Sequence, residues 1–303
     1  MRQRVFVTGA TGVIGSRSVT QLVEEGHSVS AVARSDAKAE QLRKMGATPI
    51  AVNLFDVSAL TLAFAGHDSV VNLATNIPSG LSSMNPRAWR TNDRLRREAS
   101  AAIAAAVRAS GAARMVQESI TFPYVANGSA WIAEDHPRTY FALNRTTIDA
   151  EAAANSLVSK ATAVVLRFAM FMAPESPHME MAIAAARRGF FGLMGNPDDY
   201  ISFIDADDAA SAVVAALDVP SGTYNVAEIS PDTRAQHRDA LAGVVGRQAL
   251  RQIPKLILKA GGAGAESIAR SHRISSERLQ GVCSWRPTRP SVETWSKVSR
   301  APR

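Results

Sequence analysis

Cysteine is almost absent from this 303-residue sequence, in which Cys283 is the single one. A lone cysteine excludes an internal disulfide framework and any metal site made of several cysteines, and it fits a reducing compartment. Long apolar runs are also absent, because no stretch approaches the roughly 18 residues that a membrane-spanning helix needs. The apolar run after Met1-Arg-Gln-Arg stops at Thr8, too early for a signal peptide. We therefore expect a cytoplasmic protein that binds no membrane.

Aromatic side chains are few, at 6% of residues, and basic side chains outnumber acidic ones, so the formal net charge is +7. A basic chain can bind nucleic acid, a nucleotide cofactor or an anionic substrate. The densest basic stretch, residues 87–97, holds five arginines but no series of aromatic residues on which bases could stack. We expect this stretch to be a solvated helix face, and we expect no nucleic-acid partner.

The sequence does have an ordinary globular composition, with 46% hydrophobic and 20% charged residues. Short β-branched runs alternate with amphipathic stretches, which is typical of βαβ units and a parallel sheet. We expect strands at 4–8, 28–33, 48–52, 69–73, 114–119 and 163–168, and helices at 13–25, 37–45, 57–65, 87–110 and 140–156.

Glycine and proline become frequent after Phe168, and the expected elements become shorter. The pattern predicts a doubly wound α/β domain at 1–168, completed by a strand from about 200–226, and a smaller, mainly helical lobe at 169–303. Within that second part we expect a helix from 182, a strand at 200–204, a helix at 207–217 and a strand at 223–226.

A glycine-rich turn follows the first expected strand and opens the first expected helix. Gly9 permits a tight turn, Gly12 leaves space for a pyrophosphate to approach the backbone, and Gly15 lets the helix pack closely on the strand. Unpaired N–H groups and the positive end of the helix dipole then face the phosphates. The turn predicts a Rossmann-type dinucleotide site, with contacts from Gly9, Thr11, Gly12, Val13, Ile14 and Gly15.

The end of the second expected strand distinguishes two cofactors. An acidic residue there binds the ribose 2′-hydroxyl of NAD, whereas a nearby arginine accommodates the 2′-phosphate of NADP. This strand ends Ala31-Val32-Ala33-Arg34-Ser35, with Arg34 at its tip and no acid. The sequence therefore predicts NADP(H) in preference to NAD(H), although a surface charge is the alternative interpretation of Arg34.

The spacing G-x-x-G-x-x-G resembles that of the extended and atypical short-chain dehydrogenase/reductases, the NAD-dependent epimerase/dehydratase group. Segments along nearly the whole chain support the resemblance, among them Asn-Leu-Phe-Asp at 53–56, Leu-Arg-Phe at 166–168 and Tyr-Asn-Val at 224–226. Phe-Ile-Asp at 203–205 matches too, but Asp205 replaces the histidine of the family. The resemblance implies that the cofactor is also contacted by Asn53, Leu54, Leu73, Ala74, Thr75 and Asn92.

In that family a serine or threonine after the fifth strand holds the substrate oxygen, and a Tyr-x-x-x-Lys helix supplies the proton. Ser119 occupies the serine position, with a hydroxyl bonded to the backbone as the alternative. Tyr140 is followed four residues later by Asn144, and no lysine comes before Lys160. If the helix is instead aligned on Glu151, the tyrosine and lysine positions become Leu143 and Thr147.

The missing lysine matters because a free tyrosine has a pKa of about 10, and lowering it to neutrality takes roughly 4 kcal/mol. Asn144 can bind a ribose hydroxyl but carries no charge. Arg145 carries charge but is rotated about 100° from Asn144 on a helix. Tyr124 is a second candidate proton donor, and for either tyrosine a packing role with a satisfied hydroxyl is the alternative.

Methionine and phenylalanine are concentrated between Phe168 and Gly195. These side chains either line a pocket for a fairly apolar substrate or form the core of the second lobe. Three functions stay open: an NADP(H)-dependent oxidoreductase acting on a small carbonyl or hydroxyl metabolite, a non-redox isomerase, cyclase or lyase, and a non-catalytic NADP(H)-binding regulator. We expect a monomer or a homodimer, with no metal.

Overall fold

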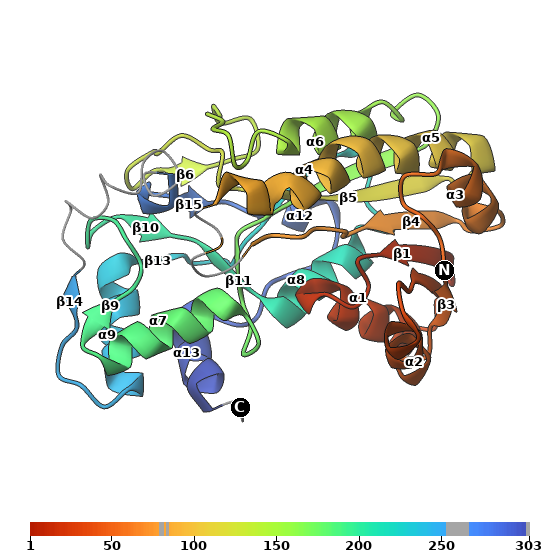
Figure 1. Cartoon of the computed structure of the whole chain (residues 1–303). Coiled ribbons are helices and arrows are strands. Elements are labelled where there is room, and N and C mark those ends of the chain that lie inside the picture. Colours follow the sequence, from red (N-terminus) through yellow and green to blue (C-terminus); the bar gives the residue numbers. More distant parts are fainter. Residues whose placement is uncertain (79–81, 83–84, 253–266, 301–303) are drawn as a thin grey trace.

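The structure, a computed structural model, describes residues 1–78, 82, 85–252 and 267–300. Its centre is a seven-stranded parallel sheet (Figure 1), which confirms the expected α/β fold class. The chain order reverses between the strand at Ser69–Asn72 and its neighbour at Arg4–Thr8. Open α/β sheets bind their ligands at such a switch point. The strands lie in the order β12 (Gly222–Val226), β7 (Thr162–Phe168), β5 (Arg114–Ile120), β4 (Ser69–Asn72), β1 (Arg4–Thr8), β2 (Ser28–Val32) and β3 (Thr48–Ile50).

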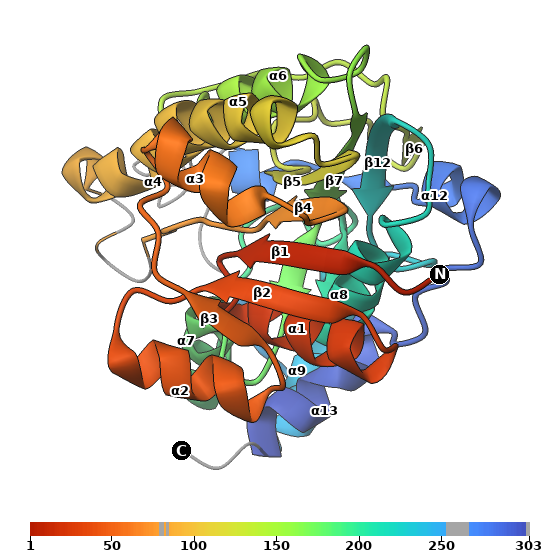
Figure 2. The same ribbon diagram turned by 90° about the vertical axis from the view of Figure 1, so that its right-hand side faces the viewer.

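Helices cover both faces of the sheet, as Figure 2 shows. One face carries α1 (Val13–Glu24) and α8 (Ala206–Ala215), which pack on each other, and the other carries α3 (Val57–Phe64), α5 (Ser100–Ser110) and α6 (Thr147–Asn155). Side-chain caps mark the start of α3, of α8 and of α2 (Asp36–Lys44). Asp56 Oδ1, for example, accepts the N–H of Ala59 at 3.0 Å at the start of α3.

The long helix expected at 87–110 is present, but it is not a uniform α-helix. It passes through a 3-10 turn, η2 (Pro86–Trp89), then α4 (Arg90–Arg94), a π-helical turn, η3 (Leu95–Ala99), and α5. The wide π turn carries Arg96, whose buried guanidinium pairs with Glu118 of β5 at 3.0 Å. The expectation of a solvated face therefore fails for Arg96, although its neighbours Arg94 and Arg97 are exposed.

The helix expected at 140–156 begins seven residues late, at Thr147, so its predicted start is wrong. Residues 142–146 form turns instead. The cause is local, because the side chain of Asn144 accepts the N–H of Phe141 at 2.9 Å and so competes with helical hydrogen bonding. Tyr140 and Asn144 consequently do not share a helix face.

The second lobe packs beyond the carboxyl ends of the strands (Figure 1). Its helices are α7 (Pro177–Arg187), α9 (Arg234–Val244) and α13 (Ser291–Arg300), whereas α12 (Glu277–Val282) packs against β12 of the sheet. The strand expected at 200–204 is divided into β10 (Tyr200–Ile201) and β11 (Phe203–Asp205). The remaining short strands are β6 (Trp131–Ile132), β8 (Met170–Met172), β9 (Phe190–Phe191), β13 (Asp232–Thr233), β14 (Arg251–Gln252) and β15 (Arg273–Ile274).

The apolar segment between Phe168 and Gly195 supplies mainly core. Met172, Met179 and Phe191 are buried in one cluster with Trp295 of α13. The pocket interpretation is therefore wrong for these three residues, whereas Met170 does line a cavity described below. No helix in the described part of the chain has the length and apolar character required to cross a bilayer.

Candidate functional site

The glycine turn has the geometry that its sequence predicts. Gly9 adopts φ +68°, and a Cβ there would lie 2.3 Å from the carbonyl oxygen of Leu73. A Cβ on Gly15 would lie 2.1 Å from the carbonyl oxygen of Gly9, so α1 can approach β1 only because this residue is glycine. Gly12 differs, because its position is exposed and a Cβ would meet only the Gly9 oxygen, at 3.3 Å.

The N-terminus of α1 is open to an external acceptor. Gly12 is its N-cap residue and provides no side-chain cap, and the first turn contains no acidic side chain. By contrast, Ser35, Asp56 and Asp205 cap α2, α3 and α8. The first N–H groups of a helix lack intrahelical partners, so α1 presents donors and a positive dipole end beside the exposed Gly12. This arrangement fits a diphosphate.

Arg34 lies at the tip of β2, next to this turn. It is exposed and forms no hydrogen bond or ion pair with any residue that the structure describes. Asn53 lies across from it after β3, where its Oδ1 accepts the N–H of Phe55 at 3.1 Å and fixes the loop. Leu54 packs partly buried against the core. These positions leave a basic side chain and an ordered loop at the expected adenosine end.

The loop after β4 runs beside the glycine turn. Leu73 and Ala74 pack against Gly9, and Thr75 follows them. The loop is held by Asn92 of α4, whose Oδ1 accepts the N–H of Asn76 at 3.0 Å. Within the described part of the protein, the buried Nδ2 atoms of Asn92 and Asn144 have no hydrogen-bond partner. Such orphaned donors are costly, so they mark places where a bound polar group would be stabilised.

Ser119, the expected substrate-holding hydroxyl, is buried in an ion-pair network. Its Oγ donates to Glu151 Oε1 at 2.7 Å. Glu151 also accepts two hydrogen bonds from Arg167, at 2.8 and 2.7 Å, and one from Arg138 at 2.7 Å. Burial alone would raise the pKa of Glu151, but hydrogen bonds and charge from Arg167, together with Ser119 and Arg138, hold it below its ordinary value.

Tyr124 belongs to the same network, which favours the packing alternative for this residue. Its hydroxyl is fully buried, donates to Asn225 Oδ1 at 2.8 Å and accepts from Arg167 Nη1 at 2.8 Å. Burial raises the pKa of Tyr124, against the lowering effect of the Arg167 charge. A proton that is shared with Asn225 and held this tightly is poorly placed to reach a substrate.

Tyr140 lies outside the network and is half-buried in the segment before α6. The guanidinium of Arg138 lies over its ring, 5.5 Å from the centroid. Burial raises the pKa of Tyr140, although the Arg138 charge opposes the rise. In the alternative alignment, Thr147 is buried and its hydroxyl donates to the Asn144 carbonyl at 2.7 Å. Neither alignment therefore gives a tyrosine acidified by a neighbouring lysine.

Sequence reasoning missed the network itself. Arg138 belongs to none of the motifs, and Glu151 and Arg167 enter the sequence analysis only through the family resemblance. The signal available was the placement of Arg167 inside a strand expected to be buried, since arginine is rarely fully buried without a partner for its charge. Asp205, the replacement for the family histidine, turns out to cap α8 and to lie 3.5 Å from Arg289.

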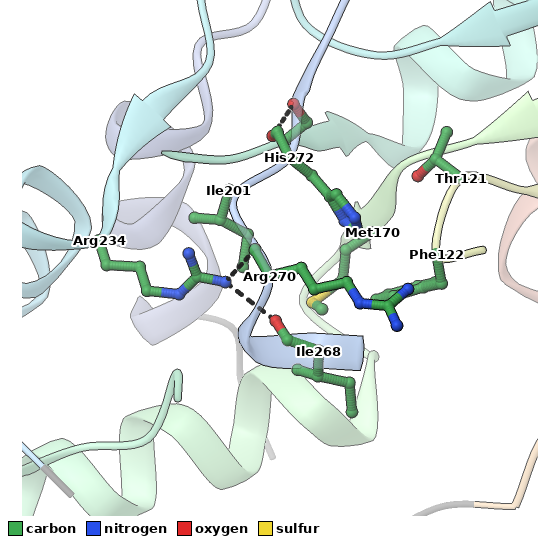
Figure 3. A pocket seen from close by; sticks show the side chains of 9 residues that line it. Thr121, Phe122, Met170, Ile201, Arg234, Ile268, Arg270 and His272 are labelled. Atoms are coloured by element: carbon green, nitrogen blue, oxygen red, sulfur yellow. Dashed lines mark hydrogen bonds between the residues drawn. The ribbon is translucent and has the colours of Figure 1, made fainter. Parts of the chain in front are cut away.

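A small cavity lies where the sheet meets the second lobe, beyond the carboxyl ends of β5 and β7 (Figure 3). Sequence reasoning did not identify it, because its walls come from distant segments. It is lined by Thr121, Phe122, Met170, Ile201, Ser202, Arg234, Ile268, Arg270 and His272.

Comparison with known proteins agrees with this architecture. The model of the NAD dependent epimerase/dehydratase family matches residues 5–227. A 3-diazoavenalumate denitrifying reductase from Streptomyces sp. is 29% identical over 298 residues, which are 95% of this chain and 97% of that protein.

Solved structures share the fold over the same extent. Human epimerase family protein SDR39U1 with NADPH has a TM-score of 0.79 at 21% identity and covers 98% of this chain and 99% of that one. MoeE5 in complex with UDP-glucose and NAD has a TM-score of 0.78 at 21% identity, covering 98% and 97%. At this identity the likeness shows the fold and leaves the substrate open.

Proposed function

Since the chain belongs to the NAD dependent epimerase/dehydratase family, we propose that it is an NADP(H)-dependent oxidoreductase acting on a small metabolite. The observation that carries the proposal is the uncapped N-terminus of α1 beside the exposed Gly12, with the exposed Arg34 next to it. A bound nicotinamide dinucleotide would supply the hydride chemistry. The relative from Streptomyces, similar over 95% of this chain, is named a reductase, which supports a redox reaction.

In this proposal, different residues bind different parts of the cofactor. The α1 amides and the turn from Gly9 to Gly15 bind the diphosphate, with Thr11, Val13 and Ile14 at its edge. Arg34 binds the adenosine 2′-phosphate, and Asn53 and Leu54 border the adenine. The loop of Leu73, Ala74 and Thr75 follows the nicotinamide half, held in place by Asn92, and Asn144 Nδ2 binds a ribose hydroxyl.

The cofactor preference is tested by Arg34→Gln. Removing one charge-assisted contact should weaken NADPH binding by about 10- to 100-fold and leave NADH binding unchanged, because only NADPH carries the 2′-phosphate. Isothermal titration calorimetry with both cofactors measures the effect. Arg43→Gln, an exposed arginine of α2 paired with Glu40, is the matched control and should change neither affinity. An Arg34→Gln variant with unaltered NADPH affinity would contradict the proposed preference for NADP(H) over NAD(H).

Tyr140 is our proposed proton donor, because this residue is only half-buried, whereas Ser119 and Tyr124 are buried with their hydroxyls bonded to protein groups. Ser119 and Tyr124 then act as positioning residues. Tyr140→Phe should lower kcat by about 100-fold with cofactor affinity retained, the size expected for loss of an acid catalyst. The measurement is the change in cofactor absorbance with a reducible substrate, with Tyr200→Phe as the control.

A second candidate reaction is a hydride transfer that needs no proton on a substrate oxygen. The buried hydroxyls of Ser119 and Tyr124 favour it, and so does the name of the Streptomyces relative, a denitrifying reductase. Undiminished kcat in Tyr140→Phe would contradict the role of Tyr140 and support this candidate. Cofactor binding without turnover of any substrate would instead support a regulatory protein.

A further inference from the structure

Arg138 is a cation that lies beside Tyr140, the proposed proton donor. Its guanidinium is placed over the Tyr140 ring, 5.5 Å from the centroid. Among the residues that the structure describes, the Arg138 side chain bonds only to Glu151, from Nη1 to Oε2 at 2.7 Å. An arginine side chain is not deprotonated in proteins. Tyr140 therefore has a permanent positive charge next to it, although the sequence places no lysine four residues further along.

The backbone around Arg138 is fixed to the end of the central sheet. Residues 137–139 run antiparallel to residues 123–125, which follow β5, and Arg138 pairs there with Tyr124. Two backbone hydrogen bonds between these segments, at 2.9 and 2.7 Å, hold the flanking residues together. Tyr140 comes directly after this pairing, so its backbone is anchored beyond the carboxyl end of β5. Ligands of open α/β folds bind at this end of the sheet.

The charge of Arg138 is only partly balanced by Glu151. The same carboxylate accepts two hydrogen bonds from Arg167, at 2.8 and 2.7 Å. One carboxylate therefore faces two guanidinium groups, and together these three side chains carry a net positive charge. Arg167 is buried, and its guanidinium lies over the ring of Tyr124. Arg138 is the member of the group that faces Tyr140.

Three charged side chains act on the hydroxyl of Tyr140. Burial, the largest effect, raises its pKa, and the Arg138 charge, the next largest, lowers it. The Glu151 charge raises the pKa and the Arg167 charge lowers it, both to a smaller extent. An opposite charge within about 6 Å favours the ionised form of a group. Arg145, the exposed cation closest in sequence, contributes none of these effects within the described part of the chain.

We propose that Arg138 takes the place of the lysine that this chain lacks, as a positioning residue whose guanidinium stabilises the negative charge left on Tyr140. In the proposed reduction, Tyr140 gives its proton to the substrate oxygen, which gains negative charge from the hydride that the dinucleotide supplies. Tyr140 is left as a phenolate until a proton returns from solvent. Glu151 keeps the guanidinium over the ring during this step. The inference rests on the proposed function and adds a residue to it.

The test measures the pKa of Tyr140 in the full chain, with and without NADPH. The chain has four tyrosines, so 3-fluorotyrosine labelling gives a simple fluorine NMR spectrum, in which Tyr140→Phe identifies the signal of Tyr140. Arg138→Gln should raise the measured pKa by about one pH unit, a 10-fold lower acid dissociation constant. Arg138→Lys keeps the charge and should restore most of the wild-type value. Arg145→Gln, which removes an exposed arginine nearby in sequence, is the matched control and should change nothing.

Arg138→Gln should fold, because Glu151 keeps its bonds to Ser119 and Arg167. Arg138→Met retains the apolar stem of the side chain and serves as a second neutral variant, with the same expected rise. An unchanged Tyr140 pKa in the neutral variants, or a rise that Arg138→Lys does not reverse, would overturn the role of Arg138. Either result leaves the proposed oxidoreductase in place. Failure of the wild-type chain to bind either nicotinamide dinucleotide removes the proposed function itself.

Discussion

Replacing Glu151 by glutamine is expected to lower the free energy of unfolding by about 3–5 kcal/mol, the cost of leaving a buried charge without its partner. The carboxylate accepts hydrogen bonds from Ser119, Arg138 and Arg167, and Arg167 is only 4% exposed. Glutamine can accept at one atom only and carries no charge. Urea denaturation followed by tryptophan fluorescence measures the change.

Two further variants distinguish the effect of losing the buried ion pair from the general effect of losing a carboxylate. Glu98→Gln removes an exposed ion pair with Arg94 and should cost less than about 1 kcal/mol. The double variant Glu151→Gln with Arg167→Met removes both buried charges, so it should be more stable than Glu151→Gln alone. A double variant as unstable as the sum of its single variants would show that the two side chains act independently, against the geometry.

The same ion pair has a pH signature. The pKa of Glu151 in the folded protein is held below its ordinary value of 4.5, so the folded state releases this proton more readily than the unfolded state does. Its stabilising contribution is therefore fully present above pH 4.5 and is lost as the pH falls through the folded pKa. Stability measured from neutral to acidic pH should fall less steeply in Glu151→Gln than in the wild-type protein.

Sequence reasoning succeeded where neighbouring residues determine the conformation. Gly9, Gly12 and Gly15 lie within one turn, and the backbone requires glycine at Gly9 and Gly15 for the reasons that the motif states in advance. The strands and helices of the first half were recovered for the same reason, because hydrophobic period and caps are local. The start of α6 failed because one side chain, Asn144, bonds to Phe141 and ends the helical pattern early.

The ion-pair network and the cavity of Figure 3 could not be predicted, because their members are distant in the sequence. Arg138, Glu151 and Arg167 meet only once α6 and β7 pack beside β5. Likewise, Met172 and Met179 are core because they share a buried cluster with Trp295, more than a hundred residues away. Periodicity reveals that a side chain is buried, but it does not reveal which partner buries it.

Replacing Gly12 by valine is the change with the largest expected effect on function, a loss of dinucleotide affinity of about 1,000-fold, or roughly 4 kcal/mol. The side chain would project from an exposed position at the open end of α1, where the diphosphate is proposed to approach the amides. Displacing the diphosphate would remove at least two charge-assisted hydrogen bonds, each contributing about 1.5–3 kcal/mol. Calorimetric titration with NADPH measures the loss.

The fold should survive this change, because a Cβ on Gly12 meets only the Gly9 carbonyl oxygen, at 3.3 Å, and φ is −81°. Gly9→Ala is the informative contrast. Its Cβ would lie 2.3 Å from the Leu73 oxygen at φ +68°, so it should lower the melting temperature by several degrees as well as weaken binding. A Gly12→Val protein that melts like the wild type but still binds NADPH tightly would show that the diphosphate does not lie on α1.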